Sequence, residues 1–344
     1  MYDAAHHFDT LYTSVPREFE FRASTREEWI AWREMFRPRL RQALGLENIE
    51  SDLRDYQSHA EMSKSEDMGD HVREHWHLWV EPTVPLPFYL LRPKTTNGLH
   101  PLVLTPHGHN HPHIYVGIAH SESEEKSMIE GERDIARQAV REGYLAIAPT
   151  TRAFGETRTE LDKQNNRTHS CRIELMHGLL VGRTPIGERV WDISRLIDWA
   201  IARPDVDVQR IAITGNSGGG TVSLFAAACD TRISVAVPSS YFCTFHGSIG
   251  SINHCDCNYV PGILRLGEMY DVAGLIAPRP FSAIAGKEDA IFPIQHVQFA
   301  YERLKQIYTV AGIPDNCQLH IGEGGHRYYK AGAWPFIRHH FNAT

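Results

Sequence analysis

The chain has 344 residues, 42% hydrophobic and 10% aromatic, which is enough apolar surface for the core of a large folded domain. Its 35 basic and 42 acidic side chains give a formal net charge of −7, which argues against nucleic acid as a partner. No signal-peptide pattern and no stretch of roughly 18 apolar residues occurs, so we expect a cytoplasmic protein with no membrane partner. Six scattered cysteines fit buried thiols in a reducing compartment.

The N-terminal part of the chain predicts a helical arm followed by antiparallel strands. Residues 25–45 place apolar side chains at helical spacing, and Gly45 marks a plausible helix end. Pro38 is expected to kink or divide this helix. Residues 71–80 and 87–92 read as strands, and a Pro-rich turn is expected between them.

From Pro101 onward, short apolar strands alternate with helices. Because continuously apolar strands of this kind form sheets covered on both faces, the sequence predicts an α/β fold with a mostly parallel central sheet. Ligands bind such sheets at the carboxyl ends of the strands, so reactive residues should directly follow strands. Two long segments, 107–131 and 241–279, are expected to wall or cover the site. The predicted strands are 102–105, 144–149, 210–214, 233–238, 280–285 and 317–321, and the predicted helices include 134–142, 187–202 and 218–227.

The strongest local motif is GNSGG at 215–219, which follows the strand RIAIT and precedes a helix of small residues. That context is typical of a nucleophile elbow, in which a tight turn exposes a serine hydroxyl and the flanking glycines make room for neighbouring backbone. The motif predicts Ser217 as a nucleophile. The N–H of Gly218, at the helix N-terminus, is a candidate oxyanion donor.

A serine nucleophile needs a histidine to take its proton and a carboxylate to fix the tautomer of that histidine. The expected chain order is serine, acid, histidine. His326 follows the strand QLHI, and Glu288 and Asp289 follow the strand PFSAIA. Asp289 could instead cap the helix that begins near Pro293. We predict His326 as general base and favour Asp289 over Glu288 as the acid.

Four histidines occupy alternate positions from His107 to His113, after the first strand of the parallel sheet. The second oxyanion donor of such an enzyme lies in this loop, so the N–H of Gly108 or His109 is a candidate. The imidazoles could converge on a metal ion, but no carboxylate joins the pattern and the oxyanion loop already explains its first part. We therefore predict no metal and no other cofactor.

A second metal-like motif is His254-Cys255-Asp256-Cys257, in the later long segment. A structural zinc site normally needs four well-spaced ligands, and no second pair is evident. Buried thiols are the favoured interpretation.

Several further residues are candidates for substrate contact. Arg152 follows a strand, where it could bind a substrate oxygen or brace a loop through backbone carbonyls. Aromatic residues of the long segments could line a pocket or form the core of a lid. The remaining candidates are His107, Asn216, Tyr241, Phe242 and Tyr259.

Together these motifs resemble the branch of the α/β-hydrolases that contains acetyl xylan esterases, cephalosporin C deacetylases and dienelactone-hydrolase-like proteins. The resemblance spans 70–344 and rests on PHGHN at 106–110, RAFGET at 152–157, GERVWDISRLIDW at 187–199, GNSGG at 215–219, VPGILRLGEMYDVAGLIAPRP at 260–280, AGKEDAIFP at 285–293 and GEGGH at 322–326. The spacing of Asp289 to Pro293 is that of this fold family. The resemblance implies an α/β-hydrolase fold, with a helical arm at 1–70 and a catalytic domain at 71–344 in a single-domain chain.

The resemblance also implies that a serine hydrolase removes acetyl or another small acyl group from a carbohydrate-like substrate, either a small molecule or an oligosaccharide. Two alternatives stay open. One is a serine peptidase of the prolyl-oligopeptidase type, although about 100 N-terminal residues are too few for the usual propeller. The other is a non-catalytic binding protein that kept the fold. The sequence leaves open whether the chain forms a homo-oligomer.

Overall fold

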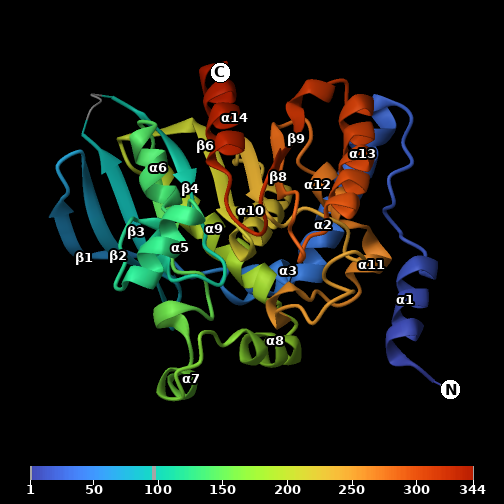
Figure 1. The fold of residues 1–344 in the computed structure, drawn as a ribbon, viewed down its shortest axis with the longest axis horizontal. Coiled ribbons are helices and arrows are strands. Elements are labelled where there is room, and N and C mark those ends of the chain that lie inside the picture. The colour runs from blue at the N-terminus through green and yellow to red at the C-terminus, as the bar shows by residue number, and fades with distance from the viewer. Residues whose placement is uncertain (1, 95–97, 344) are drawn as a thin grey trace.

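A computed structural model describes residues 2–94 and 98–343, and its centre is a nine-stranded sheet (Figure 1). The strand order is β1-β2-β3-β5-β4-β6-β7-β8-β9. The pairs from β1 to β5 are antiparallel and those from β5 to β9 are parallel, which confirms the predicted mostly parallel sheet. The strands are β1 (Ala60–Asp67), β2 (His71–Glu81), β3 (Val84–Pro93), β4 (His100–Leu104), β5 (Leu145–Pro149), β6 (Val206–Asn216), β7 (Val235–Ser239), β8 (Phe281–Gly286) and β9 (Cys317–Gly322).

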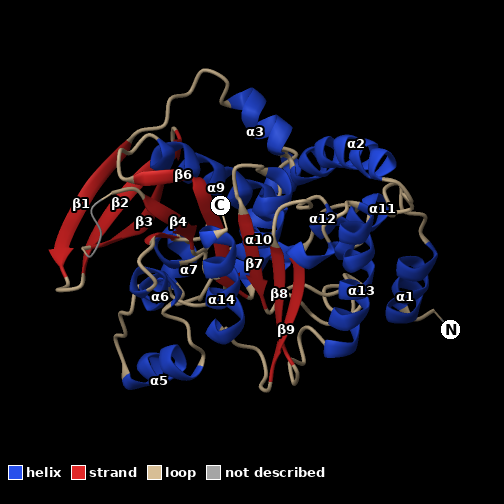
Figure 2. Cartoon of the chain, turned by 90° about the horizontal axis from the view of Figure 1, so that it is seen from above, coloured by secondary structure: helices blue, strands red, loops and turns tan. Residues whose placement is uncertain are grey.

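Helices cover both faces of this sheet, as the view from above shows (Figure 2). The buried side chains of β4 alternate between the two covers: Leu102 and Leu104 join the larger hydrophobic cluster, and Val103 joins the smaller one. The larger cluster is built with α2 (Arg26–Leu44), α9 (Pro185–Ile201), α10 (Gly218–Cys229), α12 (Met269–Gly274) and α13 (Ile294–Val310). The smaller is built with α6 (Ile135–Arg141) and α14 (Lys330–Asn342).

Shorter helices lie in the connections. They are α1 (Ala4–Ser14), α3 (Leu46–Asp52), α4 (Pro112–Tyr115), α5 (Glu122–Glu130), α7 (Glu160–Gln164), α8 (Cys171–Leu180) and α11 (Ile263–Leu266), with 3₁₀ turns η1 (Gly155–Thr157), η2 (Asp256–Asn258) and η3 (Pro314–Asn316). The two long segments therefore carry structure of their own: α4 and α5 in the first, and η2, α11 and α12 in the second. No helix in the described part of the chain has the length and apolar character needed to cross a bilayer.

Of the two effects expected of Pro38, division of the first long helix, α2, does not occur. The helix runs undivided through this proline and ends at Gly45, whose φ of 81° is left-handed, as a helix-ending glycine requires. Proline inside a helix costs about 3 kcal/mol because it removes one hydrogen bond. An apolar stripe offsets this cost, because its side chains are buried in the core: Trp29, Trp32, Phe36, Leu40 and Leu44.

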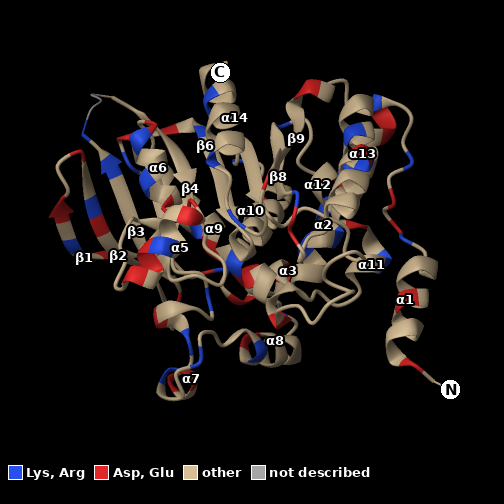
Figure 3. Cartoon of the chain, in the orientation of Figure 1, with Lys and Arg blue, Asp and Glu red and all other residues tan. Residues whose placement is uncertain are grey.

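The antiparallel edge of the sheet also differs from the prediction. The expected Pro-rich turn is mostly strand, since β3 begins at Val84 and contains Pro85 and Pro87. Only Phe88–Leu91 of β3 pair with β5, so both prolines lie where β3 pairs with β2 alone. The backbone N–H groups on the other side of β3 have no partner strand there, so proline, which lacks an N–H, is tolerated. The unpredicted β1 is an edge strand whose charged side chains discourage pairing with other chains (Figure 3).

Candidate functional site

Ser217 lies at the carboxyl end of β6, directly before α10, in the sharp turn that the motif predicts. Its φ of 58° and ψ of −118° form a conformation that residues with a side chain rarely adopt. A Cβ on Gly215 or Gly219 would lie 2.3 Å or 2.0 Å from the carbonyl oxygen of Pro106, so glycine is required on both sides of the serine. The backbone therefore holds Ser217 on a strained, half-buried elbow.

His326 and Asp289 meet at the ends of β9 and β8. The Nδ1 atom of His326 is 2.8 Å from Oδ2 of Asp289, and the carboxylate is buried. The other oxygen, Oδ1, accepts hydrogen bonds from the backbone N–H groups of Ile291 (2.9 Å) and Phe292 (3.2 Å). These bonds fix the carboxylate, which in turn favours the His326 tautomer with its proton on Nδ1. Asp289, not Glu288, thus contacts the histidine.

Two hydrogen bonds connect the loops of Ser217 and His326 to adjacent residues at the end of β7. The N–H of Ser217 donates to the Ser239 carbonyl at 2.9 Å, and Oγ of Ser240 donates to the carbonyl of Arg327 at 2.9 Å. Within the described residues no hydrogen bond joins the Ser217 hydroxyl to His326, and such contacts are often long before substrate binds. The predicted elbow and the acid–histidine pair therefore share the carboxyl edge of the sheet.

The candidate oxyanion loop packs against the first turn of α10. A Cβ on Gly108 would lie 2.7 Å from the backbone nitrogen of Gly218, so the two segments approach backbone to backbone. The N–H groups of Asn216 and Gly108 face the buried hydroxyl of Tyr115. Burial raises the pKa of Tyr115 to about 12, although these two N–H groups act to lower it. The loop that carries Gly108 and His109 thus borders the backbone nitrogen of Gly218.

The structure gives His107 a bracing role in place of the expected substrate contact. Its ring is buried, Nε2 accepts a hydrogen bond from the N–H of Thr151 (2.9 Å), and Nδ1 lies 2.7 Å from the Gly108 carbonyl. Burial lowers the pKa of His107 to about 3, so the ring is neutral and Nδ1 carries the proton. The ring fixes the shape of the oxyanion loop from behind.

Arg152 likewise braces the scaffold, which is one of the two roles that the sequence left open for it. Its Nε and Nη2 donate to both carboxylate oxygens of Asp192 at 2.8 and 2.6 Å, and Nη1 is 2.7 Å from Oε1 of Glu81. Burial acts to lower the pKa of Arg152, but the carboxylates of Asp192, Glu188 and Glu81 raise it well above its usual value. The guanidinium joins β2 to α9 through these buried ion pairs.

Three more substrate-contact candidates are core residues. Asn216, Tyr241 and Phe242 are each 1% exposed, which leaves no surface for a ligand. Tyr241 packs at 5.5 Å against Phe292, whose ring stacks on that of His326. The sequence pattern could not separate these inward-facing residues from wall residues. Tyr259 differs, because it is 39% exposed and lines an apolar hollow of about 380 Å³ beside α1.

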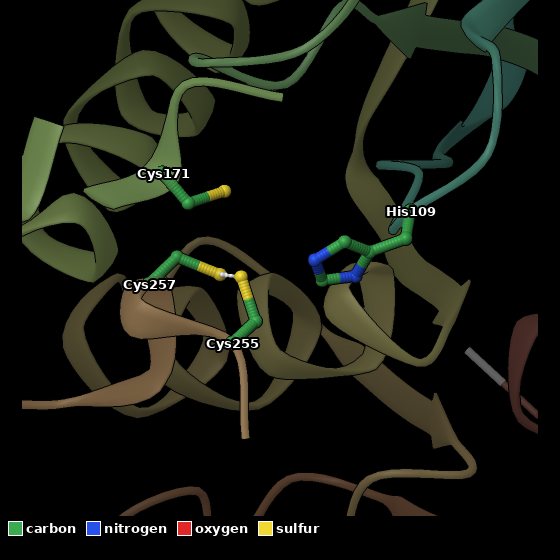
Figure 4. Close-up of side chains that lie close together, drawn as sticks. All are labelled: His109, Cys171, Cys255 and Cys257. Atoms are coloured by element: carbon green, nitrogen blue, oxygen red, sulfur yellow. Dashed lines mark hydrogen bonds between the residues drawn. The ribbon is translucent and has the colours of Figure 1, made fainter. Parts of the chain in front are cut away.

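The structure also assembles a group of possible metal ligands that the sequence did not predict as a set. His109 of the oxyanion loop, Cys171 at the start of α8, and Cys255 and Cys257 around η2 point toward one another (Figure 4). One ligand atom from each lies within 4.8 Å of the others. Cys171 and His109 are the two further ligands that a site at Cys255 and Cys257 needs, and chain spacing gives no signal for them because they come from separate segments.

Comparison with known proteins supports the same fold. A hydrolase-designated protein of Bacillus subtilis (strain 168), YtaP, is 26% identical over 248 residues, which are 70% of this chain and 77% of that protein. A Bacteroides fragilis structure described as an acetyl xylan esterase superposes with a TM-score of 0.79 at 16% identity and covers 97% of this chain and 84% of its own. The structure of methylesterase BT1017 superposes with a TM-score of 0.70 at 18% identity, and the match covers 98% of this chain and 67% of that chain.

The family to which the chain belongs is shown by a match along nearly the whole sequence. The sequence pattern of the Abhydrolase family matches residues 8–330, from the N-terminal helix to the start of α14. The sheet order and the solved structures agree with that match. The chain belongs to the Abhydrolase family and has the α/β-hydrolase fold predicted from its motifs.

Proposed function

We propose that this chain is a serine-dependent carboxylic ester hydrolase with Ser217 as nucleophile, His326 as general base and Asp289 as the orienting acid. The observation that carries the proposal is the 2.8 Å contact between His326 and Asp289 at the same sheet edge as the strained Ser217 elbow. Strain of this kind persists where it serves a function, since it costs on the order of 1–3 kcal/mol.

The arrangement supports acyl transfer in two steps. Oγ of Ser217 bonds to the ester carbonyl carbon while Nε2 of His326 takes the hydroxyl proton, and Asp289 stabilises the imidazolium. The C–O bond to the alcohol then breaks as His326 returns the proton to the leaving oxygen. Water, deprotonated by the same histidine, attacks the acyl-enzyme and releases the acid.

The negative charge of the tetrahedral intermediate needs fixed donors. We assign these to the N–H groups of Gly218 and His109, because the N–H of Gly108 faces Tyr115. Gly218 begins α10, so its N–H adds the positive end of the helix dipole. One such donor contributes on the order of 10²–10³-fold in rate.

The proposed substrate is a small acyl ester, such as an acetyl ester, of a carbohydrate-like alcohol. This step rests on the names of the similar structures, an acetyl xylan esterase and a methylesterase, and on the motifs shared with that branch. Tyr259 is the remaining candidate for substrate contact on the wall, because it is the one exposed aromatic residue of the predicted set.

Turnover of p-nitrophenyl acetate and of a panel of acetylated sugars, methyl esters and lactones tests the proposal, with Ser217→Ala as the variant. We expect the loss of Ser217 to lower kcat on the order of 10⁶-fold, as in enzymes whose triad acts as a unit. Ser251→Ala, an exposed serine of the second long segment, is the matched control and keeps full activity. Retained ester hydrolysis in Ser217→Ala, or preferential cleavage of aminoacyl nitroanilides by the wild-type chain, would contradict the proposal.

A further inference from the structure

We propose that His109, Cys171, Cys255 and Cys257 form a structural zinc site that fastens the oxyanion loop to the second long segment. The site is assembled from three parts of the chain: the loop after β4, the start of α8 and the turn η2 (Figure 4). The existence of the site is independent of the ester hydrolase proposal, while its effect on turnover rests on that proposal.

The number and type of ligands match a zinc ion. Three thiolates and one imidazole in a tetrahedron are a common structural zinc set, and soft sulfur ligands select against magnesium and calcium. Zn–S bonds of about 2.3 Å and Zn–N bonds of about 2.0 Å place ligand atoms about 3.5–3.8 Å apart in a tetrahedron. The four ligand atoms here lie within 4.8 Å of one another, so small side-chain rotations bring them to that geometry.

The burial of the four ligands suits a structural ion that exchanges slowly with solvent. Cys171 and Cys257 are buried, Cys255 is half-buried and His109 is exposed at the outer edge. A buried floor of sulfur atoms excludes water from most of the coordination sphere, and the histidine side provides a path of entry. Binding releases the three thiol protons, so zinc affinity should fall as the pH is lowered.

Polar groups around the sulfur atoms complement a negatively charged cluster. Zn²⁺ with three thiolates and a neutral imidazole carries a net charge of −1. The Nη2 atom of Arg189 is 3.8 Å from Sγ of Cys171, and Nδ2 of Asn258 donates to Sγ of Cys257 at 3.7 Å. Such N–H···S contacts orient and stabilise thiolate ligands in metal centres.

A disulfide is the main rival explanation, and the geometry favours the metal. The sulfur atoms of Cys255 and Cys257 are 3.3 Å apart, whereas a disulfide bond is about 2.05 Å long. A bond between these two residues would also leave Cys171 and His109 with no role in a cluster that includes their ligand atoms.

The site would reach the proposed catalytic centre from two sides. His109 provides its ring to the zinc and its N–H to the oxyanion hole, so the ion holds that donor in place. On the other side, Nδ1 of His254 accepts a hydrogen bond from Nδ2 of Asn258 at 3.0 Å, and the His254 ring lies 5.7 Å from Phe292, which stacks on His326. Zinc would therefore stiffen both walls around Ser217.

Metal analysis of the purified wild-type chain tests the site directly. We expect one zinc per chain by inductively coupled plasma mass spectrometry, and intense visible d–d bands of tetrahedral cobalt thiolate after exchange with Co²⁺. Cys171→Ser should lose the zinc, whereas Cys229→Ser, a buried cysteine at the end of α10, should keep it. Both variants are checked for folding by circular dichroism, and the wild-type stoichiometry stands even if Cys171→Ser unfolds.

Three outcomes would overturn the site: less than stoichiometric zinc in protein reconstituted under reducing conditions, a cobalt spectrum without tetrahedral thiolate bands, or a Cys255–Cys257 disulfide in the freshly isolated chain. The readouts do not depend on ester turnover, so a chain that binds zinc and hydrolyses no ester contradicts only the proposed function. If both proposals hold, removal of the zinc with a chelator should lower kcat. The expected loss is at most on the order of 10²-fold, which is the contribution of one oxyanion donor.

Discussion

The two sides of the candidate site are built by different means. On one side, Ser217, Asp289 and His326 each follow a parallel strand, and the sheet itself brings them to one edge. On the other side, His109 and three cysteines come from loops and short helices that no shared strand aligns. Side chains therefore hold the loop side together, through buried ion pairs, a bracing histidine and, as proposed, a zinc ion.

This difference separates two kinds of substitution. Changes at the strand ends should remove chemistry and leave the fold, because the sheet keeps its shape without them. Changes on the loop side should act through stability or through the position of the oxyanion donors. Four substitutions test this separation.

The largest effect is expected for Asp289→Asn on the strand-end side. The amide keeps the shape of the carboxylate but favours the wrong His326 tautomer, so kcat should fall on the order of 10⁴-fold with little change in the unfolding midpoint. Steady-state kinetics and a urea melt measure the two quantities. Glu288→Gln is the neighbouring control and should keep near-normal turnover; equal losses in both variants would break the assignment.

Arg152→Met, on the loop side, should destabilise the fold. Removal of the guanidinium leaves the buried carboxylate of Asp192 without its cation and Glu81 with Arg183 alone, at a cost of about 3–5 kcal/mol. Arg22→Met breaks an exposed pair with Glu20 and should cost less than about 1 kcal/mol. Urea unfolding of both variants gives the comparison, and a stable Arg152→Met would refute the bracing role.

Gly108→Ala should damage the oxyanion hole without unfolding the chain. The new Cβ would lie 2.7 Å from the backbone nitrogen of Gly218, so the loop must move away from the proposed donor. We expect kcat to fall on the order of 10²-fold. The Cβ of Gly325→Ala meets nothing closer than 3.6 Å and provides the control, although it lies next to His326. Normal kcat in Gly108→Ala would place the oxyanion elsewhere.

The smallest effect is a pH dependence of stability from two buried carboxyls at the start of α12. Both oxygens of Glu268 accept from the N–H of Phe245 (2.8 and 3.0 Å), and Oδ1 of Asp271 accepts from the N–H of Phe21 (3.1 Å). Burial raises the pKa of Glu268 to about 8 and that of Asp271 to about 7. The folded chain thus binds these protons more tightly than the unfolded chain does.

The sign follows from this difference. The contribution to stability is complete below the ordinary pKa values, 4.5 for Glu268 and 3.8 for Asp271, and is lost as the pH rises through about 7 to 8. Urea melts from pH 5 to 8 should show falling stability in the wild-type chain and a shallower fall in Glu268→Gln. Asp55→Asn, an exposed carboxylate, should follow the wild-type curve; a Glu268→Gln curve identical to wild type would contradict the prediction.

Sequence patterns predicted what depends on local order. The parallel strands and the GNSGG elbow are recognisable because each is fixed by neighbours in the chain, and the strand-end rule then links Ser217 to His326. The direction of a side chain in a loop is not fixed in this way. From the sequence, Tyr241 and Phe242 could line a pocket or form a core, and they are core; His107 reads as a substrate contact and is a buried brace.

The thiol cluster shows the same limit most clearly. Cys255 and Cys257 carry a recognisable spacing, but Cys171 and His109 join them only through the packing of α8 and the oxyanion loop. Pro38 does not divide α2 for a related reason, because the buried stripe of the helix outweighs the local preference of proline. Long-range packing decided both cases.

The measurement that tests the central claim most directly is the reaction of the wild-type chain with a fluorophosphonate, followed by peptide mass spectrometry. We predict one stoichiometric adduct on Ser217, at a rate that falls sharply in Asp289→Asn and His326→Ala. An unlabelled Ser217, or an adduct on a different residue with equal rate in all three proteins, would contradict it.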